Sequence, residues 1–172
     1  MPGTVPPLPQ MTGARHFNAD ELRQLVVLFD AIWPGGEDRP GAREAGAADY
    51  VDQLLALPAT VYYEIPSWIT RYKEGLPYLE NVARGRFGKP LAVLSRDQAT
   101  ALLADLTKGA LTGSMSAQNQ KVLFGVLRGH CIEGCVADPR WGGNREKVIW
   151  NWLGYPDGDA AQGAPAVQGT SP

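Results

Sequence analysis

The sequence predicts an all-α fold, in a single domain of about six helices. Apolar residues recur three or four positions apart through most of the chain, which is the spacing that lines one face of a helix. Two capping boxes, in which an Asn or Ser precedes a Glu or Gln by three positions, mark helix starts. Only residues 61–63 and 91–93 resemble strands, and both segments are too short to make a sheet.

The composition limits the classes of function. The 172 residues suffice for one domain with a sizeable core. With a net charge of -2 and a pI near 5.7, the chain has no overall basic field, so we expect no nucleic-acid partner. Because no apolar run is long enough to span a bilayer, we also expect no direct membrane insertion. Two cysteines are too few for a disulfide framework.

The two ends of the chain have compositions typical of disorder. Residues 1–15 are rich in proline, and residues 157–172 form a Gly/Ala/Pro/Gln tail without periodicity. We therefore predict a helical domain over residues 16–156 between two disordered segments. The N-terminus has neither a hydrophobic leader nor a twin arginine, so a cytoplasmic protein is expected if Met1 is the native start.

Caps and prolines delimit the first two helices. Asn18 and Glu21 form the first capping box, and a Pro-Gly-Gly run at residues 34–36 ends the helix that follows. A second helix is predicted over residues 47–57 and ends at Pro58. The apolar faces are formed by Leu22, Leu25, Val26, Phe29 and Ile32 in the first helix, and by Tyr50, Val51, Leu54 and Leu55 in the second.

A third helical region covers residues 59–87. We expect it to break or kink at Pro66 and Pro77, because proline removes a helical hydrogen bond. Ser95 and Gln98 then form the second capping box and open a further helix. The apolar line of the third region is formed by Trp68, Tyr72, Leu76, Leu79 and Val82.

Two more helices complete the fold. Ser114 or Ser116 starts the longest one, which ends before an Asp-Pro pair at Asp138. Asn144 is placed to cap a short final helix, and Gly154 takes the left-handed position after it.

The segment between these last two helices is the main candidate for function. Residues 130–156, HCIEGCVADPRWGGNREKVIWNWLGYP, combine an apolar helix end, a tight Gly-Gly-Asn turn and a short aromatic helix. A turn this tight fixes a geometry, which serves either to brace the fold or to dock a partner. The candidate residues for that bracing turn or partner interface are Glu133, Asp138, Arg140, Trp141, Asn144, Trp150 and Tyr155.

His130, Cys131 and Cys135 fall on one helix and suggest a metal site or a redox pair. A zinc site needs four nitrogen or sulfur ligands, and the only other histidine, His16, stands in a stretch expected to be flexible. A disulfide between positions four apart on a helix is geometrically awkward. We therefore favour buried structural roles for all three residues, and predict no metal ligands and no catalytic residues.

Two further chemical interpretations are weaker than their structural alternatives. Glu133 and Asp138 could act as an acid/base pair, but they point in different directions. Asp138 better suits a turn, and Glu133 suits an ion pair with Arg140 or Arg145. The Gly-Gly-Asn turn could bind an anion at a helix start, yet it lacks the preceding strand of a dinucleotide site, so a capped turn is favoured.

The aromatic residues of this segment exceed what one short helix can bury. Trp150 and Trp152 lie about 200° apart on a helix, so both cannot face inward. Trp and Tyr are common anchors of protein interfaces. The surplus aromatic surface favours a partner, although the ends of the chain could also cover it.

Several segments, in the same order, resemble the gluconate 2-dehydrogenase subunit 3 family. They are FNADELRQLVVLFDAIWP, PGAREAGAADYVDQLL, GLPYLENVARGRFGKPLAVLSRDQATALLADL and the segment from His130 onward. The most specific pieces are DRPGAREAG, Glu133-Gly134, Ala137-Asp138-Pro139, the WGGN turn, Trp150 and the final Gly-Tyr-Pro.

The resemblance implies an accessory subunit without a cofactor of its own. Its partner would be a large flavoprotein of the glucose–methanol–choline type, which binds FAD and oxidises a sugar, sugar acid or glycoside. A cytochrome c subunit carrying haem c often takes the electrons onward. Many relatives begin with a twin-arginine signal, so a trimmed form of such a relative would work in the periplasm. A free-standing helical protein that binds a small ligand at its aromatic corner remains the alternative.

Overall fold

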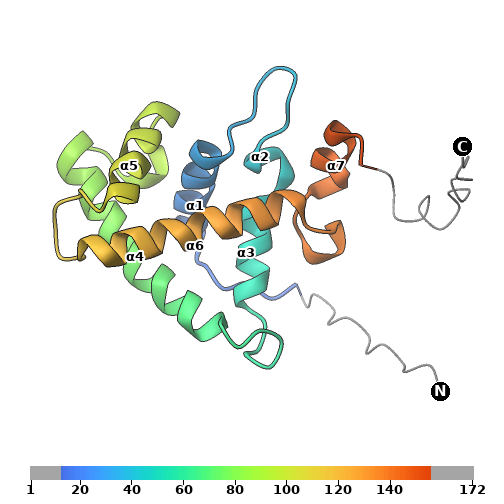
Figure 1. Cartoon of the computed structure of the whole chain (residues 1–172), viewed down its shortest axis with the longest axis horizontal. Coiled ribbons are helices and arrows are strands. Elements are labelled where there is room, and N and C mark those ends of the chain that lie inside the picture. The colour runs from blue at the N-terminus through green and yellow to red at the C-terminus, as the bar shows by residue number, and fades with distance from the viewer. Residues whose placement is uncertain (1–12, 156–172) are drawn as a thin grey trace, which may run out of the picture.

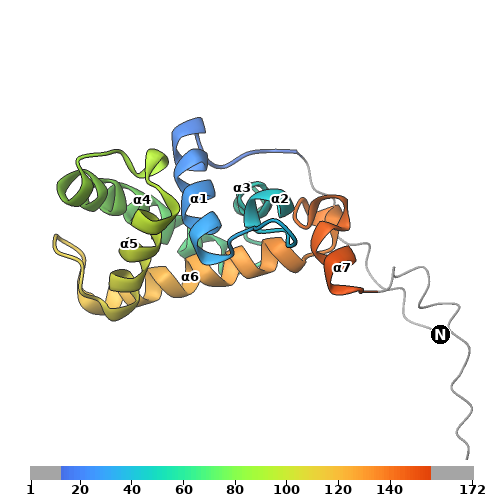
Figure 2. The ribbon, with the colours of Figure 1, turned by 90° about the horizontal axis from the view of Figure 1, so that it is seen from above.

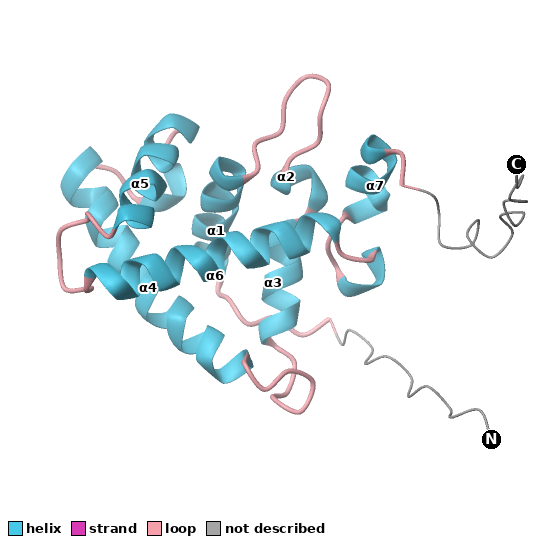
Figure 3. Ribbon diagram, in the orientation of Figure 1, coloured by secondary structure: helices cyan, strands magenta, loops and turns pink. Residues whose placement is uncertain are grey.

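The computed structural model describes residues 13–155 and confirms the all-α prediction (Figure 3). The predicted tail and most of the predicted N-terminal segment lie outside the described residues. Within them the chain forms seven α-helices, three single-turn 3-10 helices and no strand. The α-helices are α1 (Ala19–Ile32), α2 (Ala42–Ala45), α3 (Ala47–Leu55), α4 (Ile65–Phe87), α5 (Arg96–Lys108), α6 (Ala117–Val136) and α7 (Val148–Leu153).

Helix α6 runs along the length of the molecule, and the other helices are arranged around it (Figures 1 and 2). Helices α4 and α5 lie toward its N-terminal end, and α7 lies beyond its C-terminal end. Helix α1 packs against α3, α5 and α6. The core between them is built mainly from leucine, with the largest fully buried side chains at Tyr72, Phe29, Leu79, Leu102 and Leu127.

The two predicted capping boxes are confirmed at atomic detail. The side chain of Asn18 accepts hydrogen bonds from the backbone N–H groups of Asp20 and Glu21, and Glu21 accepts one from Asn18 in return. Ser95 and Gln98 make the same reciprocal pair before α5. These signals are local, so the sequence alone carries them.

Two details of the middle of the chain differ from the prediction, and the choice between Ser114 and Ser116 as a helix start is resolved. The third helical region begins at Ile65 instead of residue 59, with Pro66 in the first turn of α4, where its missing N–H costs nothing, and the helix includes Pro77. Helix α4 has 23 residues and α6 has 20, so the prediction that the helix before Asp138 is the longest was wrong. Ser116, rather than Ser114, caps α6. The two strand-like segments form a 3-10 turn and a turn before α4.

Helix α2 is an additional element that the sequence did not reveal. Its four residues lie in a segment rich in Gly and charged residues, which is typical of a loop. The Glu44 carboxylate accepts a hydrogen bond from the Gly41 backbone N–H at 2.7 Å, which fixes the start of the turn. Gly46, with φ of 68°, then separates α2 from α3. This element accounts for seven helices instead of about six.

Candidate functional site

The Gly-Gly-Asn turn after α6 folds back onto the end of that helix. The backbone N–H of Asn144 donates to the carbonyl oxygen of Gly134 at 2.8 Å. Its side-chain oxygen accepts a hydrogen bond from the N–H of Ile149, in the first turn of α7, at 2.9 Å. The N-cap residue of α7 is Lys147 and not Asn144 as predicted, although the Asn144 side chain still supplies an acceptor to the first turn. Asn144 is fully buried and joins α6 to α7.

Three backbones approach closely at this point. A Cβ atom on Gly143 would lie 2.2 Å from the Gly134 carbonyl oxygen, and one on Gly134 would lie 2.8 Å from the Cα of Ala47. Neither distance is possible for a real side chain, so both positions require glycine. The turn, α6 and the start of α3 are therefore in direct backbone contact. This packing leaves no room for a ligand between the turn and α6.

The chain between the turn and α7 adopts an unusual conformation. Asn144, Glu146 and Lys147 have φ values of 40°, 54° and 57°, in the left-handed region that residues with side chains rarely occupy. Each such residue costs about 1 kcal/mol or more, so the surroundings must hold it in place. The side-chain nitrogen of Asn144 is also buried without a hydrogen-bond partner. The turn is therefore a strained segment that its contacts must stabilise.

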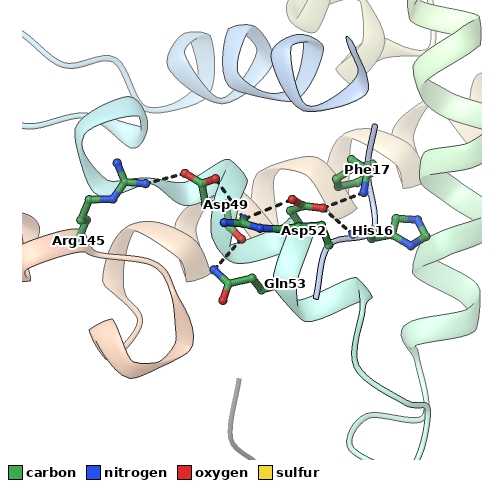
Figure 4. Close-up of polar contacts among 7 residues, drawn as sticks. His16, Phe17, Asp49, Asp52, Gln53 and Arg145 are labelled. Atoms are coloured by element: carbon green, nitrogen blue, oxygen red, sulfur yellow. Dashed lines mark hydrogen bonds and ion pairs between the residues drawn. The ribbon is translucent and has the colours of Figure 1, made fainter. Parts of the chain in front are cut away.

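Helix α3 supplies those contacts through a network of carboxylates (Figure 4). The Asp49 carboxylate pairs with Arg145, on the turn, at 2.6 Å and with Arg15 at 3.3 Å. The side-chain nitrogen of Gln53 donates to the Asp49 carbonyl at 3.3 Å, and a Cβ on Gly142 would lie 2.3 Å from that nitrogen. The turn is thus anchored on α3 by an ion pair and by close packing.

The same helix anchors the beginning of the described chain. The Asp52 carboxylate, which is 1% exposed, accepts hydrogen bonds from the backbone N–H groups of His16 and Phe17, both at 2.7 Å (Figure 4). Arg15 lies 3.3 Å from the same carboxylate. His16 was expected in a flexible stretch, but its backbone is fixed here. An aspartate on the apolar face of a predicted helix is the signal that could have identified this anchor.

The charged residues of the predicted site pair differently from the prediction. Glu133 was expected to meet Arg140 or Arg145, but Arg145 pairs with Asp49, and Glu133 accepts a hydrogen bond from the Tyr50 hydroxyl at 3.5 Å. Burial raises the pKa of Glu133 above its usual value, and the hydrogen bond from Tyr50 offsets only part of that rise. Burial and the charge of Glu133 also raise the pKa of Tyr50.

Asp138 forms a local turn, as predicted. Its carboxylate accepts hydrogen bonds from the guanidinium group of Arg140 at 2.7 Å and from the Arg140 backbone N–H at 3.0 Å. The hydrogen bond from the Arg140 side chain lowers the pKa of Asp138. These contacts close the 3-10 turn that leads into the Gly-Gly-Asn sequence.

His130 and the two cysteines occupy buried positions, as predicted. His130 is buried, and its Nδ1 lies 2.9 Å from the Tyr72 hydroxyl. Burial lowers the pKa of His130 to about 4, so the ring is neutral at neutral pH. Cys131 and Cys135 are buried core residues with free thiols. Among residues 13–155, no group of three His, Cys, Asp or Glu residues is arranged to hold a metal ion.

The aromatic residues near α7 divide into a bracing residue and an exposed group. The indole N–H of Trp150 donates to the Val136 carbonyl, at the end of α6, at 2.9 Å, and its ring lies 5.2 Å from that of Tyr155. Trp152, Leu153 and Tyr155 are 47%, 57% and 58% exposed. As predicted, Trp150 and Trp152 do not both face inward. We call Val136, Trp152, Leu153 and Tyr155 the α7 surface.

The structure therefore brings together only part of the predicted set. Asn144 and Trp150 brace α7, the Asp138–Arg140 pair shapes the turn before it, and Tyr155 belongs to the exposed group. Trp141 is half-buried in the turn, and Glu133 contacts α3. Sequence reasoning missed Asp49 and Gln53, which support the turn from about ninety positions away, and Asp52, which anchors the start of the described chain.

None of the helices in the described part of the chain combines the length and the hydrophobicity needed to cross a bilayer.

Comparison with known proteins identifies the family of this chain. The family model of gluconate 2-dehydrogenase subunit 3 matches residues 19–158. This range includes all seven described α-helices and the turn at residues 142–147, which we call the braced turn. No curated protein and no solved structure matches the chain significantly. The match covers most of the 172 residues and agrees with the resemblance of the individual segments. This chain therefore belongs to the gluconate 2-dehydrogenase subunit 3 family.

Proposed function

We propose that this chain is the non-catalytic small subunit of a dehydrogenase complex, and that the α7 surface docks on the large subunit. In this proposal the large subunit is a flavoprotein of the glucose–methanol–choline type, which binds FAD and oxidises a sugar, sugar acid or glycoside. A cytochrome c subunit with haem c would accept the electrons in a three-subunit form. Membership of a family of dehydrogenase subunits supports the accessory role.

The exposed α7 surface is the observation that supports docking most directly. Single exposed apolar residues are common on protein surfaces, but three large ones within four positions are not. Trp and Tyr contribute large contact areas in protein interfaces and lose little conformational entropy on binding. Burial of these side chains against a partner would remove an apolar surface that otherwise lowers solubility.

The braced turn explains how so short a helix can present a docking surface. Helix α7 has six residues and would not be stable alone in water. Asn144 joins it to α6, Trp150 bonds to the end of α6, and Arg145 ties the turn to α3. The bracing residues therefore hold Trp152, Leu153 and Tyr155 in a fixed arrangement, which reduces the entropy lost on association.

Co-purification of the tagged chain with the large subunit tests the docking surface. We expect Trp152→Ser with Tyr155→Ser to reduce the recovered large subunit at least about tenfold, which corresponds to about 1.4 kcal/mol, because Trp and Tyr are enriched among the residues that dominate binding energy in interfaces. Tyr63→Ser is the matched control, since Tyr63 is 84% exposed but precedes α4, away from α7. Equal recovery with the double variant and the wild-type chain would contradict docking through α7.

A further inference from the structure

A polar cleft lies between the second half of α4, the end of α5 and the loop that leads into α6. Its volume is about 560 Å³, within the usual range for small-molecule sites. Helices α4 and α5 lie at the opposite end of α6 from α7 (Figures 1 and 2), so the cleft that they line is separate from the braced turn. Its polar lining residues are Tyr78, Asn81, Arg86, Asp105, Thr112 and Ser114.

The loop that forms one wall of the cleft is held by buried hydrogen bonds. The side chain of Gln120, on α6, is buried, accepts a bond from the Leu111 N–H and donates to the carbonyl oxygens of Leu111 and Met115. The Tyr78 hydroxyl lies 3.3 Å from the carbonyl oxygens of both Leu111 and Thr112. Because the loop is fixed from two sides, the cleft is formed before any ligand arrives.

A glycine that no contact inside the protein requires forms part of the opposite wall. Gly85 lies inside α4, where glycine costs about 1 kcal/mol relative to alanine. A Cβ atom at this position would meet nothing within 4 Å, so packing inside the protein does not require glycine. Gly85 lines the cleft on the same face of α4 as Asn81 and Val82, so we infer that a side chain here would extend toward the cleft. The glycine therefore keeps the cleft open at a cost to helix stability.

The polar groups of the cleft define the chemistry of a ligand. Arg86 and Asp105 form an ion pair at 2.7 Å, so their charges offset each other. The exposed side chains of Asn81, Thr112 and Ser114 make no hydrogen bonds within the described residues and can each donate and accept. We propose that this cleft binds a small neutral polyhydroxylated molecule, a polyol or a sugar.

Other ligand classes fit the cleft less well. An anion would have to compete with Asp105 for the Arg86 guanidinium group. An apolar molecule would cover the hydroxyl and amide groups without offering them hydrogen bonds, which is costly. Hydroxyl groups can satisfy donors and acceptors together, while the C–H faces of a polyol can pack against Val82 and Leu111.

The proposal is tested on the full-length chain by NMR titration. With D-sorbitol or D-glucose as probes, we expect saturable shifts of the backbone amide signals of Asn81, Gly85 and Ser114. Inorganic phosphate and cyclohexanol should leave these signals unchanged. Absence of saturable shifts with both neutral probes would overturn the proposal, and so would stronger binding of phosphate than of either probe.

Two leucine variants separate binding in the cleft from general effects. Gly85→Leu should weaken sorbitol binding at least about tenfold, because its side chain fills the cleft. Gly125→Leu is the matched control, since Gly125 is an equally unconstrained helical glycine that does not line the cleft. Unchanged binding in a folded Gly85→Leu chain would refute the site.

If that variant unfolds, Asn81→Ala with Ser114→Ala applies the same test. The isolated chain is sufficient throughout, so the outcome is independent of subunit assembly.

Discussion

Asn144 donates its backbone N–H to the carbonyl oxygen of Gly134, 2.8 Å away, and this bond fixes the turn after α6 against the helix that precedes it. The contact is possible because both Gly134 and Gly143 lack side chains. The side-chain oxygen of Asn144 then holds the start of α7. Asn144 thus helps to place the exposed aromatic residues of α7, together with Trp150 and Arg145.

Close packing at the turn predicts a large effect of adding a single methyl group. Gly143→Ala would place a carbon 2.2 Å from the Gly134 carbonyl oxygen, so the turn must move. We expect the free energy of unfolding to fall by about 3 kcal/mol, measured by urea denaturation. Gly125→Ala, in open space on α6, should instead raise it by about 0.5–1 kcal/mol. A fully stable Gly143→Ala protein would refute the packing described for the turn.

The buried Asp52 carboxylate predicts a local loss of order. Asp52→Ala would leave the backbone N–H groups of His16 and Phe17 without their acceptor. We expect the free energy of unfolding to fall by about 2–3 kcal/mol and hydrogen exchange to become faster at those two amides. Asp49→Ala, which removes a partly exposed carboxylate, should cost about 1 kcal/mol or less. Equal exchange rates in wild type and Asp52→Ala would contradict the anchoring role.

The buried His130 predicts a pH dependence of stability. Its folded-state pKa of about 4 lies below the usual value of 6.5, so the unfolded chain binds the proton first as the pH falls. The contribution of the neutral His130 ring to the free energy of unfolding is complete above about pH 6.5. It is lost as the pH falls toward 4, by about 3 kcal/mol in total. Urea denaturation from pH 7 to pH 4 should show a smaller decline in His130→Gln than in wild type. An identical decline would show that His130 does not titrate in this way.

The half-buried Trp141 predicts an indirect effect on assembly. Trp141→Ala should loosen the turn that places α7, and so weaken the complex with the large subunit on size-exclusion chromatography. Because the residue acts through the turn, we also expect a lower melting temperature for the isolated chain. A complex of unchanged size and stability would contradict this role. Tyr63→Ala is a suitable control, since that side chain is exposed before α4.

Local signals explain why most helices could be predicted from the sequence. The capping boxes at Asn18 and Ser95 involve residues three positions apart, and Gly154 ends α7 through its own left-handed backbone. The sequence therefore contains nearly all the information that fixes these boundaries. Helix α2 was missed because its four residues follow no helical period and depend on a Glu44 side chain that returns to Gly41.

The candidate site could be predicted only in part, because its supports are distant in sequence. The composition of the WGGN turn indicated a tight corner, and the spacing of Trp150 and Trp152 indicated that one of them is exposed. The pairing of Arg145 with Asp49 joins residues 96 positions apart, and no local pattern predicts it. The same holds for the approach of Gly134 to Ala47, which depends on how α3 and α6 cross.

A tagged pull-down from the native host, followed by an absorption spectrum of the eluate, tests the central claim most directly. Our account predicts that a large subunit co-purifies with the chain and shows the absorption bands of a bound flavin. The Trp152→Ser, Tyr155→Ser chain, handled in parallel, should lose both the subunit and the bands. Recovery of the wild-type chain as a colourless monomer would contradict the proposal that it is the small subunit of a flavoprotein dehydrogenase.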